Sequence, residues 1–262
     1  MKGYVIGFYD SGIGGLPYLR WMKERTSDCT YRYLAENRYF PFGTRTEEEI
    51  RSIVNGSIGR FIEKTDPDMI VIACNTASVT ALELLRKNYS IPFVGVVPAI
   101  KPAGLLSRNK TIGLFATNKT VSQAYTQNLI DSFASECKVR RFAMPEIVSF
   151  VENRIFSANR KETAEMIAPA AEFFRKNGAD TVILGCTHFI YLEEIFREIL
   201  GPEINIVDSR EGVGKRAISL LEQINPRECP EKDLFFTTSE AQMPENYRYI
   251  PESFGLEFGG EI

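Results

Sequence analysis

Two matching segments decide the fold of this 262-residue chain: Asp68-Met-Ile-Val-Ile-Ala-Cys74-Asn-Thr76 and Asp180-Thr-Val-Ile-Leu-Gly-Cys186-Thr-His188. Each contains an acidic residue, an apolar run, a small residue, a cysteine and then hydrogen-bonding side chains. A continuous apolar run between polar residues is typical of a parallel strand that is buried on both faces. Each cysteine therefore follows the carboxyl end of a buried strand, which is where open α/β sheets bind ligands.

The sequence around these segments alternates between strand and helix patterns, in the same order twice. Besides the strand before Cys74, the first half predicts strands over residues 4–9, 30–35 and 91–97, and helices over residues 16–23, 46–64 and 78–88. Besides the strand before Cys186, the second half predicts strands over residues 110–117, 138–142 and 204–208, helices over 122–135, 161–177 and 192–200, and a loop over 145–151. A further helix is expected over 212–223, and the tail from Asp233 should add a strand and a terminal helix that pack on the first half.

This alternation predicts parallel sheets with helices on both faces. We therefore expect an α/β protein with two similar parallel-sheet domains and the active site in the cleft between them. The first domain should comprise residues 1–98 and 210–262, and the second residues 99–209. Each domain would then present one thiol to the shared cleft.

The composition is that of an ordinary globular protein, with 44% hydrophobic and 25% charged residues. A net charge of −3 gives no basic footprint for nucleic acid. No apolar stretch approaches the roughly 18–20 residues that a membrane span needs, and the amino terminus lacks a signal-peptide layout. We therefore expect a cytoplasmic protein that binds neither nucleic acid nor membrane.

The five cysteines form an odd number without a CxxC motif, which indicates reduced thiols rather than a disulfide framework. A single histidine and the lack of a cysteine pair at ligand spacing argue against a zinc or iron site. We expect no metal and no cofactor. The chemistry must then come from thiols, carboxylates, hydroxyls and one imidazole.

Cys74 and Cys186 are the candidate catalytic residues. A single strand cysteine is most often a small buried hydrophobic residue, but two at equivalent points of a repeat indicate function. Each is followed by a predicted helix, whose amino terminus lowers the pKa of a thiol, so that one partner can be a thiolate near neutral pH. Two opposed acid/base groups can remove a proton from one face of a carbon and return one to the other face. The pair therefore predicts a cofactor-free racemase.

Other polar residues are expected beside the thiols. His188 follows Cys186 by two residues and can shuttle protons, although it could instead be a hydrogen-bonded core histidine. Asp10 ends the first strand and could pair with Cys74, although it could instead form an Asx-turn. Neutral donors and acceptors at strand ends suit the carboxylates and ammonium of a substrate: Ser11, Asn75, Thr76, Thr117 and Thr187.

The turn Gly12-Ile-Gly-Gly15 lies between the first strand and the first helix. It does not match a dinucleotide-binding loop, because Pro17 occupies the third glycine position of G-x-G-x-x-G. We expect its glycines to let backbone N–H groups approach an anionic substrate group.

Five motifs together resemble the glutamate racemases of the aspartate/glutamate racemase superfamily. They are Phe8-Tyr-Asp10-Ser11-Gly-Ile-Gly-Gly15, Phe40-Pro-Phe42-Gly43-Thr44, Cys74-Asn75-Thr76-Ala-Ser78, Gly95-Val-Val-Pro98 and Leu184-Gly-Cys186-Thr187-His188. The match extends from about residue 4 to residue 222, in order and at family-like spacing. The resemblance implies an isomerase that interconverts L- and D-glutamate without pyridoxal phosphate and supplies D-glutamate for bacterial peptidoglycan. We expect a homodimer.

The resemblance also implies residue roles. Cys74 and Cys186 would be the two acid/base thiols, Asp10 and His188 their assistants, and Glu152 a further acidic residue near the site. Substrate contacts would come from Asp10, Ser11, Phe42, Gly43, Asn75, Thr76, Thr117, Thr187 and His188.

The chain departs from the family pattern at three places. The family usually has a tyrosine at Phe42, Gly-Asp at Ala35-Glu36 and Tyr-Pro at Phe189-Ile190. The first departure affects substrate fit only if the missing hydroxyl itself holds the carboxylate.

Other activities occur in the same superfamily, including aspartate racemase, hydantoin racemase and arylmalonate decarboxylase. The decarboxylases lack one cysteine, so the presence of both Cys74 and Cys186 argues against them. A protein of a different class could use this scaffold without catalysis, for example as a regulator that binds DNA gyrase. The intact thiols, Asp10 and His188 favour an enzyme.

Overall fold

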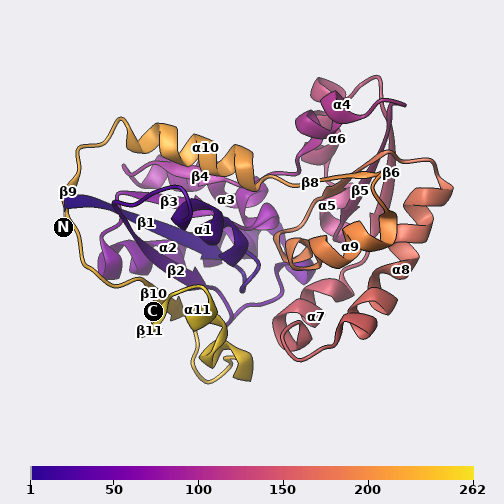
Figure 1. The fold of residues 1–262 in the computed structure, drawn as a ribbon. Helices are drawn as coiled ribbons and strands as arrows, with labels where there is room; N and C mark the ends of the chain where they lie inside the picture. Colours follow the sequence, from indigo (N-terminus) through magenta and orange to yellow (C-terminus); the bar gives the residue numbers. More distant parts are fainter. Residues whose placement is uncertain (1) are drawn as a thin grey trace. The chain divides into compact units, whose positions relative to one another are not determined.

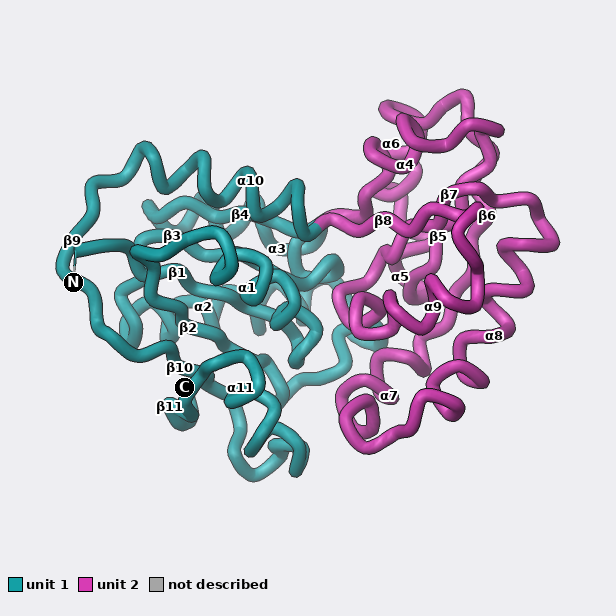
Figure 2. Tube along the Cα trace, viewed as in Figure 1, with its two compact units in different colours: residues 1–96, 210–262 teal, residues 97–209 magenta. Residues whose placement is uncertain are grey.

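The computed structural model describes residues 2–262 of the chain. The chain divides into two compact units: unit 1 comprises residues 1–96 and 210–262, and unit 2 comprises residues 97–209 (Figure 2). Each unit contains its own sheet of mainly parallel strands with helices packed around it (Figure 1). The expectation of an α/β protein with two parallel sheets is confirmed.

The sheet of unit 1 has the strand order β11-β10-β2-β1-β3-β4, and neighbouring strands on this path are parallel. These strands are β1 (Lys2–Asp10), β2 (Cys29–Ala35), β3 (Met69–Ile72), β4 (Phe93–Gly95), β10 (Leu234–Thr237) and β11 (Glu257–Glu261). A short strand, β9 (Arg227–Glu228), pairs with β1 in the antiparallel sense. The helices are α1 (Leu16–Lys23), η1 (Phe42–Thr44), α2 (Glu47–Thr65), α3 (Asn75–Asn88), α10 (Arg210–Leu221), η3 (Glu245–Arg248) and α11 (Ile250–Ser253).

The sheet of unit 2 has the order β6-β5-β7-β8, again all parallel. Its strands are β5 (Thr111–Ala116), β6 (Lys138–Ala143), β7 (Thr181–Leu184) and β8 (Asn205–Val207). Its helices are α4 (Ile100–Leu106), α5 (Asn118–Ser122), α6 (Ala124–Phe133), α7 (Glu146–Arg154), α8 (Arg160–Lys176), η2 (Thr187–Leu192) and α9 (Glu193–Leu200). The order matches β2-β1-β3-β4 of unit 1 strand for strand, which confirms the internal repeat.

The two repeated segments form β3 and β7, and every residue of both strands is buried. The acidic residue at the start of each segment stabilises the start of its strand through hydrogen bonds. Asp68 accepts hydrogen bonds from the backbone N–H of Val5 and from Arg227, both at 2.7 Å. Asp180 accepts a hydrogen bond from the Ser107 hydroxyl at 2.6 Å. It also accepts from the backbone N–H groups of Arg108 and Asn109. These carboxylates are therefore structural, and the cysteines lie at the opposite, carboxyl ends of the strands.

The tail packs on unit 1 as expected, because β10 pairs with β2. It ends in the strand β11 rather than in a helix, and its only helical segments after residue 233 within the described chain are the short η3 and α11. Helix α2 starts with a capping box, in which the Thr46 and Glu49 side chains each bind the other's backbone N–H.

One predicted loop is wrong, because residues 146–154 form helix α7. Ile147, Phe150 and Val151 are all buried and have the spacing of one helix face. The segment looked like a loop because it is short and follows Pro145, yet a proline is well tolerated where a helix begins. This helix carries Glu152.

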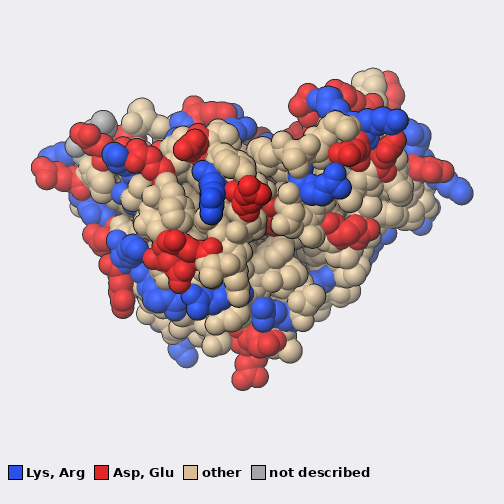
Figure 3. Space-filling model, turned by 90° about the horizontal axis from the view of Figure 1, so that it is seen from below, with Lys and Arg blue, Asp and Glu red and all other residues tan. Residues whose placement is uncertain are grey.

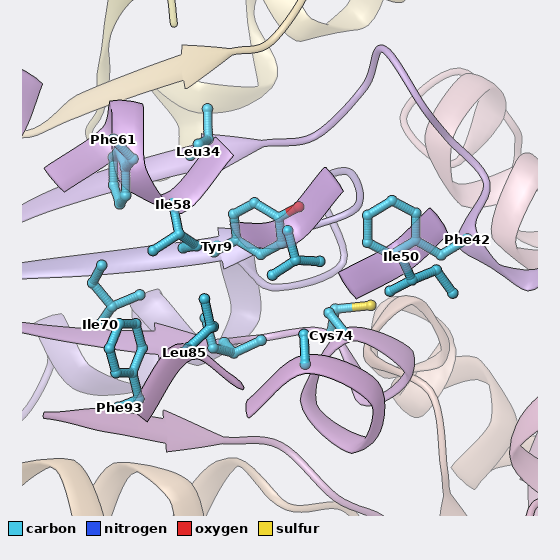
Figure 4. Packing of buried hydrophobic residues seen from close by; sticks show 14 of the residues in the cluster. Tyr9, Leu34, Phe42, Ile50, Ile58, Phe61, Ile70, Cys74, Leu85 and Phe93 are labelled. Carbon is cyan, nitrogen blue, oxygen red and sulfur yellow. The ribbon is translucent and has the colours of Figure 1, made fainter. Parts of the chain in front are cut away.

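Figure 4 shows the apolar cluster on one face of the unit 1 sheet. Its members include Phe61 and Phe93 at one end and Phe42, Ile50 and Cys74 at the other. The core of unit 1 therefore extends up to the cysteine at the carboxyl edge of the sheet.

Charges of both signs are interspersed on the face drawn in Figure 3. This face presents no continuous basic surface. Among residues 2–262, no helix is both long enough and apolar enough to cross a membrane.

Candidate active site

Each unit places one cysteine just beyond the carboxyl end of a central strand, beside other predicted site residues. Half-site 1 consists of Asp10, Ser11, Phe42, Gly43, Cys74, Asn75 and Thr76, all in unit 1. Half-site 2 consists of Thr117, Glu152, Cys186, Thr187 and His188, all in unit 2. All the residues predicted from the sequence therefore fall into one of two groups.

In half-site 1, hydrogen bonds link a thiol to a hydroxyl and the hydroxyl to a carboxylate. The Cys74 thiol donates to Ser11 Oγ at 3.8 Å, and Ser11 Oγ donates to Asp10 Oδ1 at 3.2 Å. The Ser11 backbone N–H donates to the same Asp10 oxygen at 2.6 Å. Asp10 is fully buried, and Ser11 and Cys74 are nearly so. Ser11 therefore lies between Asp10 and Cys74, and a direct role of Asp10 beside the thiol stays a prediction.

Cys74 is the N-cap residue of α3, with extended backbone. Asn75 and Thr76 form the first turn, so the helix starts three residues before the predicted Ser78. The Asn75 Oδ1 atom is buried and accepts no hydrogen bond from any residue in the described chain. Because an unpaired buried acceptor is costly, this oxygen is well suited to receive a donor from a ligand.

Phe42 belongs to the apolar cluster that contains Tyr9, Ile50 and Cys74, and only 2% of its surface is exposed (Figure 4). Its ring forms part of the apolar surroundings of the thiol and offers no hydrogen bond. Gly43 follows in the turn η1, where a Cβ atom would meet nothing within 4 Å. Polar contacts from these two residues must therefore come from their backbone.

Glu36, the second departure from the family pattern, lies at the same sheet edge. Its backbone N–H donates to Asp10 O at 2.8 Å. Its carboxyl is fully buried and accepts hydrogen bonds from Ser57 Oγ on α2 and from Thr238 Oγ1 after β10, the latter at 2.5 Å. Burial raises the pKa of Glu36, and these two hydrogen bonds oppose the rise. Glu36 therefore ties the end of β2 to α2 and to the tail.

Replacing Glu36 with glutamine should stabilise the protein increasingly as the pH rises. The folded-state pKa of Glu36 lies above the unfolded value of about 4.3. The free energy of unfolding of the wild-type protein therefore decreases as the pH rises from about that value to the folded-state pKa. The melting temperature of Glu36→Gln relative to wild type should therefore climb as the pH rises above about 4.3. Glu49→Gln is the control of opposite sign, because hydrogen bonds from Thr46 lower the pKa of Glu49: its melting temperature relative to wild type should fall as the pH rises toward about 4.3 and stay constant above that pH. A Glu36→Gln difference that is constant with pH, or largest in acid, would contradict this.

In half-site 2, a thiol, an imidazole and a carboxylate follow one another. Cys186 Sγ lies 3.9 Å from His188 Nδ1, and His188 Nε2 lies 2.5 Å from Glu152 Oε1. His188 and Glu152 are both only 2% exposed. When Glu152 accepts the hydrogen bond, His188 donates through Nε2–H, and its other ring nitrogen, Nδ1, faces the thiol. The imidazole can then take a proton from Cys186 or return one.

The two threonines of half-site 2 differ in their surroundings. Thr187 is buried directly beside Cys186 at the start of η2. Thr117 is half-buried and caps α5, with its Oγ1 3.2 Å from Thr120 Oγ1. Contacts of Thr117 and Thr187 with a substrate stay predictions.

Tyr33 lies outside the residues to which the sequence patterns point. Its hydroxyl donates to Gly12 O at 2.8 Å and accepts from the Gly15 N–H at 3.1 Å. The sequence pattern predicts only that an aromatic residue in a strand belongs to the hydrophobic core. The fold shows that the Tyr33 hydroxyl reaches the glycine turn beside Ser11.

Comparisons with known proteins show which family the chain resembles. A family model described as Asp/Glu/Hydantoin racemase matches residues 18–211. The glutamate racemase of Shewanella loihica is 39% identical over 230 residues, which cover 88% of this chain and 86% of that protein.

Solved structures give the same result. The crystal structure of Escherichia coli glutamate racemase in complex with L-glutamate and the activator UDP-MurNAc-ala has a TM-score of 0.91 and 31% identity, covering 99% of this chain and 98% of that one. A glutamate racemase isoform from Bacillus anthracis has a TM-score of 0.80 and 27% identity, covering 100% and 98%. The chain therefore belongs to the Asp/Glu/Hydantoin racemase family.

Proposed function

We propose that this protein is a cofactor-independent glutamate racemase that uses Cys74 and Cys186 as its two acid/base groups. The observation that carries the proposal is the repeat itself. Equivalent strands, β3 and β7, each end at a thiol, and each thiol has its own chain of proton-handling partners. The names of the relatives and the L-glutamate bound to the E. coli protein support glutamate as the substrate.

The proposed reaction needs both thiols to reach one α-carbon from opposite faces. With L-glutamate, the Cys186 thiolate takes the α-proton, the Cα–H bond breaks and a carbanion forms. The Cys74 thiol then gives its proton to the other face, which yields D-glutamate and a Cys74 thiolate. The reverse reaction starts from that thiolate, so the two enantiomers exchange the roles of acid and base. The assignment of each cysteine to one enantiomer follows the family resemblance.

The main physical difficulty is that the α-proton of a free amino acid is only weakly acidic. Donors that surround the substrate carboxylate stabilise the developing negative charge, which is usually the largest catalytic contribution. The Ser11, Thr76 and Thr187 hydroxyls and the backbone of the glycine turn are the proposed donors. The unpaired Asn75 Oδ1 is the proposed acceptor for the substrate ammonium.

We further propose that the D-glutamate serves peptidoglycan biosynthesis, and through it cell wall formation and cell shape. The cytoplasmic location and the homodimer stay predictions.

The purified protein, dialysed exhaustively against a chelator, should convert L-glutamate to D-glutamate without pyridoxal phosphate, metal or nucleotide. In deuterium oxide the product should carry deuterium at the α-carbon. Polarimetry and proton NMR with L-glutamate and L-aspartate, at matched concentrations, measure both expectations. Equal or faster turnover of aspartate would contradict the substrate, and activity that returns only when metal or pyridoxal phosphate is added would contradict the mechanism.

A further inference from the structure

We propose that Tyr33 is a positioning residue for Cys74, because its hydroxyl fixes the glycine turn that holds Ser11 against the thiol. This inference rests on the proposed function and adds to it a residue that the sequence patterns did not single out. It concerns half-site 1 alone, so its effects should be confined to chemistry at Cys74.

One hydroxyl closes both ends of the turn. Tyr33 Oη donates to Gly12 O at 2.8 Å and accepts from the Gly15 N–H at 3.1 Å, and Tyr33 itself is fully buried. Buried backbone groups need partners, so this hydroxyl satisfies one donor and one acceptor of the turn. Gly12 directly follows Ser11, whose Oγ receives the Cys74 hydrogen bond at 3.8 Å.

At Gly15 the turn packs closely against residues of half-site 1. A Cβ atom on Gly15 would lie 2.6 Å from Ala73 Cβ, 3.0 Å from Tyr33 Oη and 3.3 Å from Asp10 Cβ. Gly15 therefore touches the residue before Cys74 and also the carboxylate residue of the half-site. Displacing the turn must disturb the spacing between Ser11, Asp10 and Cys74.

The Tyr33 ring is itself held from the tail. It stacks on Phe235 of β10 with the ring centroids 5.4 Å apart and the planes 9° from parallel. Phe235 in turn meets the edge of Tyr247, with centroids 5.6 Å apart. The carboxyl-terminal segment of unit 1 thereby helps to aim the hydroxyl at the turn.

Tyr33→Phe, which removes only the hydroxyl, tests the proposal in two backgrounds. With Cys186→Ser, D-glutamate α-proton exchange in deuterium oxide depends on Cys74. With Cys74→Ser, L-glutamate exchange depends on Cys186. At saturating substrate, Tyr33→Phe should slow the first exchange about tenfold or more and the second less than about threefold, because small displacements of a reacting group are costly. An equal loss in both backgrounds, or no loss in either, overturns the proposal.

Tyr31→Phe is the matched control, because Tyr31 is also a buried tyrosine of β2 and its hydroxyl bonds to Thr26, away from the turn. It should leave both exchanges within about threefold of their parents. Phe235→Leu keeps the Tyr33 hydroxyl but removes the ring that stacks on the Tyr33 ring. It should reproduce the selective loss more weakly, and it serves as the test if Tyr33→Phe does not fold.

Alkylation by iodoacetamide gives a readout that needs no turnover. In the protein with both cysteines, Tyr33→Phe should change the alkylation rate of Cys74 at least about threefold and leave that of Cys186 unchanged. Unchanged Cys74 alkylation overturns the inference while leaving racemisation intact, whereas absence of glutamate racemisation in the wild type overturns the proposed function.

Discussion

Replacing either Cys74 or Cys186 with serine should stop racemisation of glutamate in both directions. Interconversion needs a base on one face and an acid on the other, and serine is far too weak an acid to replace a thiol. The loss in kcat should be roughly 10²–10⁴-fold or more for either variant, and the double variant should lose little more than either single one. Polarimetry from each enantiomer measures both directions.

Cys29→Ser and Cys137→Ser are the matched controls, one in each unit. Burial raises the pKa of Cys29 to about 11, so this thiol stays protonated at neutral pH. Both controls should retain racemisation within about threefold of wild type. A Cys74→Ser or Cys186→Ser protein that racemises at a near-wild-type rate would defeat the two-thiol account.

Replacing His188 with asparagine should lower kcat for L-glutamate by about 10²-fold, because Cys186 then loses the imidazole that exchanges protons with it. Glu152→Gln should cost less, about tenfold, since it changes only the group that orients the imidazole. Steady-state kinetics at saturating L-glutamate provides the measurement. A Glu152→Gln loss larger than that of His188→Asn would show that the carboxylate has a more direct role.

For the His188 and Glu152 variants, a loss of stability must be separated from a loss of catalysis. His188→Asn removes a hydrogen-bond partner of the Glu152 carboxyl, which is only 2% exposed, and losing a partner of a buried polar group destabilises a fold. The double variant His188→Asn with Glu152→Gln replaces the pair by two neutral groups. It should recover the melting temperature that His188→Asn loses, without recovering kcat. Recovery of kcat together with the melting temperature would mean that the imidazole is structural.

Much of the fold follows from local sequence patterns. The short apolar runs identify β3 and β7 because strands buried on both faces carry mainly apolar side chains, although β7 begins with the buried Thr181. The repeat predicts the shared strand order because equivalent patterns bury equivalent faces. Helix α7 escaped prediction because its three buried apolar positions are too few to distinguish a short helix from a loop.

The candidate site is only partly readable from the sequence, for a different reason. Cys74, Asp10 and Ser11 come from strand ends, and parallel strands bring their carboxyl ends to one edge. The contact between Glu152 and His188 joins two elements far apart in the chain, and the family resemblance indicated only that Glu152 lies near the site. The Tyr33 hydroxyl, on β2, forms hydrogen bonds with the turn that follows β1. The pattern of apolar residues in a strand does not predict such a contact.

The central claim is that each unit supplies the base for one enantiomer. It is tested most directly by following α-proton exchange in deuterium oxide by proton NMR, with Cys74→Ser and Cys186→Ser each given pure L- or pure D-glutamate. Cys74→Ser should exchange the α-proton of L-glutamate slowly and leave D-glutamate untouched, and Cys186→Ser should show the reverse preference. Two variants that exchange both enantiomers equally well would contradict the account.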